Sequence, residues 1–208
     1  MPKKQFYLLL LSLFILSCSK KKGEFTIRGS VNDITLSLPL YPATVKLYKV
    51  PVGSTNEVLI GTTSTDSKGS YSFSFPREKM EKYILRFTKN LYFEIEETVY
   101  FSDLSLDEPY IRNTSTTAKS WAKLTFHNLN PQASDHFQYI KQEGKMSCLE
   151  CCPSAYQDFY GALDTSIYCI NDGNSTYSFL YWVLGTSNQG SQAVFTTAFD
   201  TTEIILNY

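Results

Sequence analysis

Four cysteines in the second half of the chain have the clearest capacity for chemistry. Cys148, Cys151 and Cys152 form a C-x-x-C-C motif, and Cys169 follows further on. In a reducing compartment this pattern would suit zinc binding or thiol–disulfide exchange, whereas in an oxidising one it favours structural disulfides. A bridge between the neighbours Cys151 and Cys152 would strain the backbone, so two pairings stay open: 148–151 with 152–169, or 148–152 with 151–169. We expect disulfides and no metal site.

The two histidines are the other candidate catalytic groups. His127 lies on the polar side of the alternation Lys123, Thr125, His127, as a solvated strand residue would, and His136 follows Asp135 in an expected turn. The sequence has no G-x-S-x-G elbow, H-E-x-x-H motif, P-loop or Gly-rich dinucleotide fingerprint. A Cys–His pair could form on folding, but a disulfide would remove its nucleophile. We therefore expect no catalysis and no cofactor, and a hydrolase or thiol enzyme is the least favoured alternative.

An aromatic run near the C-terminus could bind a ligand. In a strand, one face would carry Tyr177, Phe179, Tyr181 and Val183, and the other Leu180, Trp182 and Leu184. A central strand covered on both sides explains this pattern. The functional alternative is an apolar groove in which Tyr181 and Trp182 contact a sugar ring or a peptide, so these two are the candidate ligand-binding residues.

The N-terminus indicates export. Lys3 and Lys4 precede an apolar run from Phe6 to Leu16 that ends at Ser17-Cys18, which is typical of a secretory signal. Eleven helical residues cover only about 16 Å, whereas a membrane span needs about 30 Å. Export would place the later cysteines in oxidising surroundings.

The end of this segment, Ile15-Leu16-Ser17-Cys18, resembles the lipobox of bacterial lipoproteins. The resemblance implies a cleaved signal peptide over residues 1–17, lipid attachment at Cys18, and a tether over residues 18–23. Ser19 stands where some lipoproteins carry an inner-membrane retention Asp, so the resemblance favours a lipid anchor in the outer membrane, on either its periplasmic or its cell-surface face. Acyl chains on one cysteine hold a protein on a membrane without a span.

Composition indicates a folded and nearly neutral chain. Of its 208 residues, 43% are hydrophobic, 15% are aromatic and 19% are charged, with a net charge of −1. The aromatic content can fill a core, which excludes disorder. No excess of positive charge is present to hold a phosphate backbone, so we expect no nucleic-acid partner.

The hydrophobic period after Glu24 is two. In Ser70-Tyr71-Ser72-Phe73-Ser74-Phe75 rings alternate with serines, which predicts a strand with one buried and one wet face. Asp66 and Gly69 suit the preceding turn, because Asp accepts backbone N–H bonds and Gly allows a positive φ. Many short strands separated by turn residues predict an all-β protein of antiparallel sandwiches.

Two sandwich domains are expected. Pro109 and the polar run from Arg112 to Thr117 break the strand pattern. They place a linker at 109–116 between domains at 24–108 and 117–208, each large enough for one core. A single large sandwich is the alternative. Within the second domain, 141–163 is expected to be a disulfide-stapled insertion with one or two helical turns between Ser154 and Tyr160.

The first domain resembles a named family. The strings Ile27 to Val31, Ala43 to Tyr48 and Thr65 to Phe73 are similar to the G-x-V strand, the A-x-V-x-L strand and the T-D-x-x-G-x-Y-x-F hairpin of carboxypeptidase regulatory-like domains. This resemblance implies an Ig-like or transthyretin-like Greek-key sandwich of seven strands, generally non-catalytic.

These observations predict an extracytoplasmic lipoprotein that acts as a non-catalytic binding or adhesion module, with a glycan or an envelope protein as its partner. A structural accessory subunit of an envelope complex is the first alternative.

Overall fold

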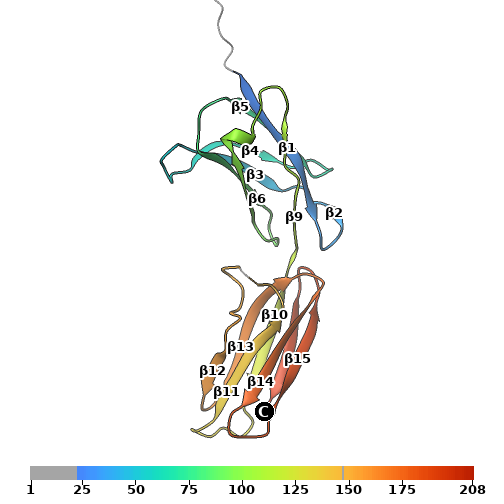
Figure 1. Cartoon of the computed structure of the whole chain (residues 1–208). Helices are drawn as coiled ribbons and strands as arrows, with labels where there is room; N and C mark the ends of the chain where they lie inside the picture. Colours follow the sequence, from blue (N-terminus) through green and yellow to red (C-terminus); the bar gives the residue numbers. More distant parts are fainter. Residues whose placement is uncertain (1–22, 147) are drawn as a thin grey trace, which may run out of the picture.

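The computed structural model describes residues 23–146 and 148–208. The predicted signal peptide, the lipobox and Cys18 lie outside these residues. The described chain is all β apart from one 3-10 turn, Phe101–Asp103, which confirms the predicted fold class. None of its helices is long and apolar enough to cross a membrane. Figure 1 shows two successive β-sandwiches joined where β9 runs into β10.

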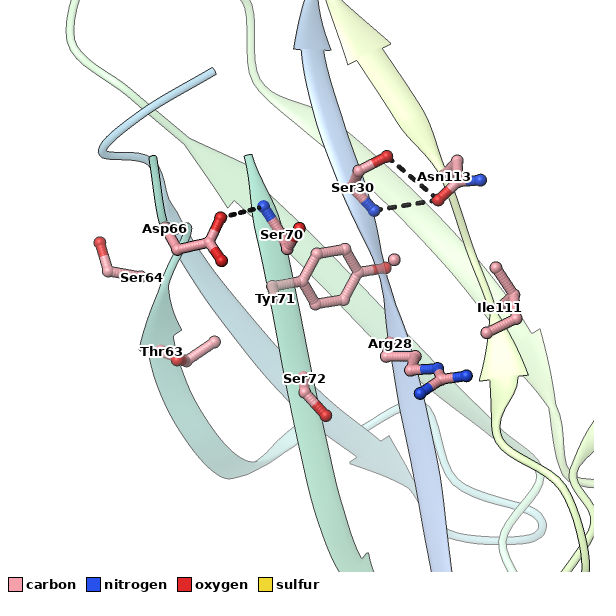
Figure 2. A pocket seen from close by; sticks show the side chains of 11 residues that line it. Arg28, Ser30, Thr63, Ser64, Asp66, Ser70, Tyr71, Ser72, Ile111 and Asn113 are labelled. Atoms are coloured by element: carbon pink, nitrogen blue, oxygen red, sulfur yellow. Dashed lines mark hydrogen bonds between the residues drawn. The ribbon is translucent and has the colours of Figure 1, made fainter. Parts of the chain in front are cut away.

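One sheet of the first sandwich is organised around β1. Its central path is β2-β1-β5, and β8 and β9 also pair with β1. The strands are β1 (Glu24–Asp33), β2 (Leu38–Pro39), β5 (Ser70–Pro76), β8 (Tyr110–Ile111) and β9 (Thr114–Thr116). The solvent side of this sheet carries mainly short hydroxyl side chains, several of which appear in Figure 2.

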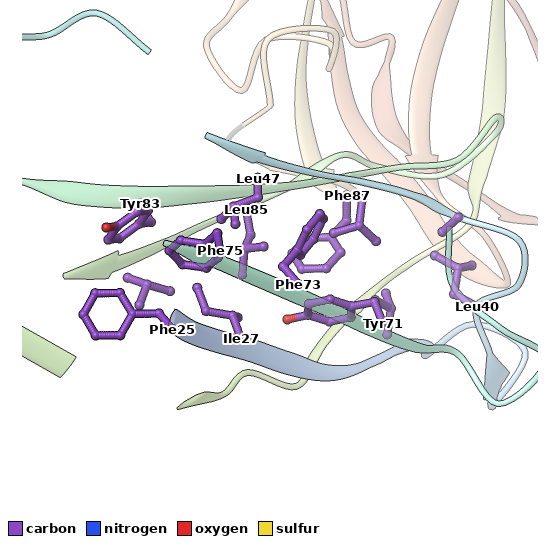
Figure 3. Packing of buried hydrophobic residues seen from close by; sticks show 14 residues of the cluster. Phe25, Ile27, Leu40, Leu47, Tyr71, Phe73, Phe75, Tyr83, Leu85 and Phe87 are labelled. Carbon is purple, nitrogen blue, oxygen red and sulfur yellow. The ribbon is translucent and has the colours of Figure 1, made fainter. Parts of the chain in front are cut away.

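The other sheet has the order β4-β3-β6-β7. These strands are β3 (Thr44–Val50), β4 (Val58–Ser64), β6 (Lys82–Thr88) and β7 (Ile95–Tyr100). Figure 3 shows the rings of Tyr71, Phe73 and Phe75 on β5 directed toward the side chains of this sheet. The alternation of rings and serines thus has the predicted effect, because all three rings are buried and the serines are not.

The turn before β5 also forms as predicted. The Asp66 carboxylate accepts hydrogen bonds from the backbone N–H groups of Ser70 (2.8 Å) and Lys68 (2.9 Å). Gly69 has φ +73°, and a Cβ there would lie 2.5 Å from the Val31 carbonyl oxygen. Both residue types are therefore needed for this turn.

The second sandwich packs a three-stranded sheet, β13-β10-β16, on a four-stranded sheet, β12-β11-β14-β15. The strands are β10 (Lys119–His127), β11 (His136–Glu143), β12 (Gln157–Tyr160), β13 (Asp164–Asp172), β14 (Ser175–Val183), β15 (Gln189–Thr196) and β16 (Thr201–Asn207). Phe126 is fully buried among Phe137, Tyr139 and Phe179, with ring centroids 4.8 to 5.8 Å away.

The region predicted as a linker, 109–116, instead contributes two strands. Tyr110–Ile111 and Thr114–Thr116 pair in parallel with β1. The backbone approaches β1 so closely that a Cβ on Gly29 would lie 1.8 Å from the Arg112 carbonyl oxygen. The polar run from Arg112 to Thr117 broke the hydrophobic pattern because this edge of the sheet is solvated, and the prediction mistook a solvated edge for a linker.

Side chains from both sandwiches meet at their junction. The Phe93 ring lies under the ammonium groups of Lys145 (4.4 Å) and Lys119 (5.3 Å), and Lys119 also pairs with Glu150 (2.5 Å). Such cation–π contacts contribute about 0.5–2 kcal/mol each. Tyr92 contacts the ring of Phe199, with centroids 5.4 Å apart. The two sandwiches are therefore in contact through side chains and are not joined by the connecting backbone alone.

Candidate functional site

The two predicted ligand-binding residues lie on opposite faces of β14. Tyr181 faces the core and lies over Phe137, with centroids 6.3 Å apart, whereas Trp182 is half-buried on the outer face. Successive side chains of a strand point to opposite faces, so the two cannot share one groove. The outer face of β14 is also not covered by another layer, which corrects the expectation of a strand buried on both sides.

Trp182 belongs to a group of polar and aromatic side chains on the outer face of the four-stranded sheet. We call this group the aromatic face; it consists of Gln138, His136, Tyr156, Asp158, Tyr160 and Trp182. Trp182 pairs across the strands with Gln138, and its ring lies 6.0 Å from that of Tyr156. Tyr156 and Tyr160 are exposed by 55% and 70%. The sequence indicated Trp182, but it did not reveal the partners that β11, β12 and the cysteine-bearing loop bring to it.

A hydrogen-bonded carboxylate lies within the aromatic face. One oxygen of Asp158 is 2.7 Å from Nε2 of His136 and accepts a hydrogen bond of 3.0 Å from the Gln138 amide. The His136 ring stacks on Tyr160 with centroids 4.2 Å apart. His136 was expected in a turn, but it is the first residue of β11. The second Asp158 oxygen has no partner among the described residues, so the face offers an acceptor beside aromatic rings.

A cross-linked loop places Tyr156 against Trp182. Of the two pairings left open, the structure has Cys148–Cys151 and Cys152–Cys169. The loop is also held by Lys141, which is 4% exposed and donates to the carbonyl oxygens of Lys145 and Cys152, both at 2.7 Å. Burial lowers the pKa of this ammonium group.

The helical turns expected between Ser154 and Tyr160 do not form. Residues 157–160 are the edge strand β12, which pairs with β11 from His136 to Tyr139. Lys141 to Glu143, also expected in the insertion, complete β11. The alternation of Asp158 and Tyr160 outward with Phe159 inward outweighed a helix signal that rested only on Ser154 and Gly161.

The groups considered for catalysis are separated. His127, at the end of β10, is 2.7 Å from Asp164, whereas His136 is on the other sheet. All four cysteines of the described segments are disulfide-bonded. Across residues 23–146 and 148–208, no three His, Cys, Asp or Glu side chains come together as metal ligands would. That the chain is not an enzyme stays a prediction.

The first sandwich has a shallow cavity of about 680 Å³ on its hydroxyl-rich face (Figure 2). Its lining includes Ser30, Ser72 and Asn113, and it contains no exposed aromatic ring. Asp66 lies at its rim, but its pKa is lowered by the backbone N–H groups of Ser70 and Lys68 that hold the turn. The cavity's exposed apolar side chain is Ile111, so this cavity offers hydrogen bonds but no exposed aromatic ring for stacking.

A second cavity, of about 800 Å³, lies between the sandwiches. Ile34 and Phe93 line it from the first sandwich, and Lys145, Leu149 and Glu150 line it from the disulfide loop. The Leu149 side chain is fully exposed at the tip of this loop. The cavity is part of the junction, and Lys145, which lines it, already lies over Phe93 and pairs with Asp172.

Comparisons with known proteins found matches among solved structures. No family model and no curated protein matches the chain. Among solved structures it is similar to the Bacillus anthracis TIE protein, with 14% identity, a TM-score of 0.38, and 89% of this chain aligned to 34% of that one. A streptococcal ancillary pilin is 11% identical with a TM-score of 0.35, and 90% of this chain aligns to 63% of that one. A minor pilin of Streptococcus agalactiae is 9% identical with a TM-score of 0.36, and 88% of this chain aligns to 94% of that one. The chain thus spans about a third of the first of these structures and under two thirds of the second.

Proposed function

We propose that this protein is a lipid-anchored envelope protein whose second sandwich binds a glycan through the aromatic face. The lipobox at Ile15 to Cys18 supports the anchor and an outer-membrane location. The disulfides Cys148–Cys151 and Cys152–Cys169 support an oxidising compartment. The observation that carries the binding proposal is the pair formed by half-buried Trp182 and exposed Tyr156, beside the Asp158–Gln138 hydrogen-bonding pair.

The chemistry of the aromatic face fits an uncharged sugar. Rings of Trp and Tyr offer wide apolar contact to the C–H face of a pyranose, and the carboxylate and amide can accept and donate hydrogen bonds to its hydroxyls. The face carries the anion Asp158 and no Lys or Arg, while Glu143 lies further along the same sheet beside Ser178. Acidic polysaccharides would be repelled there, so we expect neutral glycans.

A glycan array followed by calorimetry tests this proposal. Residues 23–208 should bind neutral oligosaccharides such as cellohexaose or chitohexaose in preference to alginate oligomers. Trp182→Ala should weaken binding at least about tenfold, because it removes stacking worth about 1.5 kcal/mol or more. Trp121→Ala is the matched control, since Trp121 is half-buried on the outer face of the opposite sheet. Absence of binding to the array, or equal losses in both variants, would contradict the proposal.

The anchor needs its own experiment. Replacing the sulfur in Cys18→Ser should release the protein from the membrane fraction or leave the uncleaved precursor, because the lipid can no longer be attached. A Ser19→Ala variant is the control and should still be processed and lipidated. Normal processing and membrane fractionation of Cys18→Ser would overturn the lipoprotein assignment.

One feature favours the alternative, a structural subunit of an envelope complex. β15 is the last strand of its sheet, and none of its eight residues is charged. Edge strands that lack charge, proline and bulges can pair with a strand of a partner protein. A stoichiometric partner that stays bound after detergent extraction and is lost in Ala193→Lys would favour this alternative over glycan binding.

A further inference from the structure

Both sandwiches pair their first strand in parallel with their last. In the first, Ile27 and Arg28 of β1 pair with β8, and Val31–Asp33 pair with Thr114–Thr116 of β9. In the second, seven residues of β10, Trp121–His127, pair with Thr201–Asn207 of β16. The arrangement is therefore repeated along the molecule.

Parallel pairing determines how a pull along the chain is resisted. The chain enters the first sandwich at the start of β1 and leaves it at the end of β9, and these two points lie at opposite ends of the paired strands (Figure 1). Tension between them slides the strands past each other, so that the ladder hydrogen bonds are loaded together. Tension on the near ends of an antiparallel pair would instead break the bonds one after another.

We infer that the β1–β8–β9 unit is a mechanical clamp that lets the first sandwich carry tension between the N-terminal tether and the second sandwich. The source of that tension, an anchored protein holding a ligand, rests on the proposed function. The resistance itself follows from the strand geometry and does not depend on it.

Further contacts reinforce the clamp between its two ladder segments. The Arg112 N–H donates to the Arg28 carbonyl (2.9 Å), and the Asn113 side-chain oxygen accepts from the backbone N–H (3.0 Å) and hydroxyl (3.2 Å) of Ser30. Figure 2 shows Asn113 and Ser30 facing each other across the strands. The Tyr71 hydroxyl donates to the Arg112 carbonyl at 2.8 Å. Side chains thus bridge the positions where the ladder is interrupted.

The clamp is also tied to the other sheet. Arg112 forms an ion pair with Glu97 of β7, and the Thr114 hydroxyl donates to the same carboxylate at 3.0 Å. Side-chain hydrogen bonds to charged groups are stronger than those between neutral groups. Load on β9 is therefore shared between both layers of the sandwich.

Single-molecule force-clamp measurements on residues 23–208 test the inference in two pulling directions. Handles on the two termini load the clamp in shear. A handle on the N-terminus and one on Pro76→Cys pull on Glu24 and its direct partner across the antiparallel β1–β5 pair, which peels the strands. At equal force we expect the first sandwich to unfold at least about tenfold more slowly in the first direction. Equal rates in both directions would overturn the clamp, whatever the glycan result.

Extension steps identify which sandwich has opened. With handles on the two termini, the first sandwich should release about 90 residues, roughly 320 Å of chain, whereas the disulfides should hold the second to about 70 residues, roughly 250 Å. Reduction should lengthen only the shorter step. The clamp can therefore be assigned without truncating the protein.

Variants locate the resistance. Asn113→Ala removes two hydrogen bonds of the clamp and should raise the unfolding rate under terminal load about tenfold to thirtyfold. Ser64→Ala is the control, because it removes a hydroxyl hydrogen bond to Ala43 in the other sheet, and its rate should change less than about twofold. Gly29→Ala, which forces β1 and Arg112 apart, should have a larger effect if it folds. If Asn113→Ala and Ser64→Ala have the same rate, the proposal fails.

Discussion

The two sandwiches share the parallel pairing of their end strands but differ in the surfaces they present. The hydroxyl-rich face of the first sandwich carries Thr26, Ser30, Ser72 and Ser74, whereas the aromatic face of the second carries Trp182, Tyr156 and Tyr160. The second is also the one cross-linked by disulfides. Under the proposed function, the two sandwiches divide the work: the first is a spacer and the second contacts the ligand.

The largest effect should come from breaking one core while leaving the other intact. Phe126→Ala empties the centre of the second core and should cost about 3–5 kcal/mol. Both tryptophans, Trp121 and Trp182, belong to the second sandwich, so fluorescence in urea follows that sandwich alone. Circular dichroism should show a separate first-sandwich transition that has not moved. In the matched variant Leu85→Ala, the first-sandwich transition seen by circular dichroism should move to lower urea while the fluorescence transition stays in place. If both transitions move together in either variant, the sandwiches unfold as one unit.

The disulfides should account for the next largest difference. In the chain-entropy model, Cys152→Ser with Cys169→Ser should destabilise the second sandwich by about 3 kcal/mol, and Cys148→Ser with Cys151→Ser by about 2 kcal/mol, because the latter pair closes a shorter loop. Urea midpoints from tryptophan fluorescence measure both. If the order is reversed, strain or loop contacts outweigh chain entropy.

Alkaline pH should weaken each sandwich through a different tyrosine. Burial and the Asp33 carboxylate raise the pKa of Tyr92 to about 12, and burial and Asp135 raise the pKa of Tyr208 to about 12. The unfolded chain then releases these protons from about pH 10, so stability is complete below pH 10 and falls as the pH rises toward 12. Tyr92→Phe should reduce the loss of unfolding free energy at alkaline pH by about 1 kcal/mol in the first sandwich and leave the second unchanged. Tyr208→Phe should do the same for the second sandwich and leave the first unchanged. Urea midpoints at pH 8, 10 and 11 measure it.

The smallest effect should come from the hydroxyl-rich face. Ser72→Ala removes an exposed hydroxyl and should change stability by less than about 0.5 kcal/mol. Calorimetry with the neutral oligosaccharide should give an unchanged affinity. A large loss of binding in this variant would assign the ligand to the first sandwich and reverse the division of labour.

The strands were predictable wherever one face of a strand is buried. Local spacing was enough to predict β5 and the turn before it. The rings of Tyr71, Phe73 and Phe75 alternate with serines, and Asp66 and Gly69 are the residue types that the turn needs. Edge strands were missed, since β9 and β12 are short and solvated and their pairing partners are distant in sequence. Their assignment depends on tertiary pairing that no local pattern contains.

The candidate site was predictable only in part. Trp182 stood out as an aromatic residue on the second face of a strand, but pairing it with Tyr181 ignored the period of two. Tyr156 and Asp158 could not be connected to it from sequence, because the choice between two disulfide pairings and the register of β12 bring them there. Sequence spacing therefore identified the residue types and left their assembly undetermined.

The succession of the two sandwiches sets the distance between the start of β1 and the aromatic face. At a rise of about 3.3 Å per residue, the length of β1 and the stretch of β14 from Ser175 to Trp182 place the indole roughly 55 Å from Glu24. The electrostatic potential of a charged bilayer decays over about 8 Å in physiological salt. A chain held upright on a membrane would present Trp182 well outside that potential, where lipid headgroup charge no longer influences which polymer reaches it.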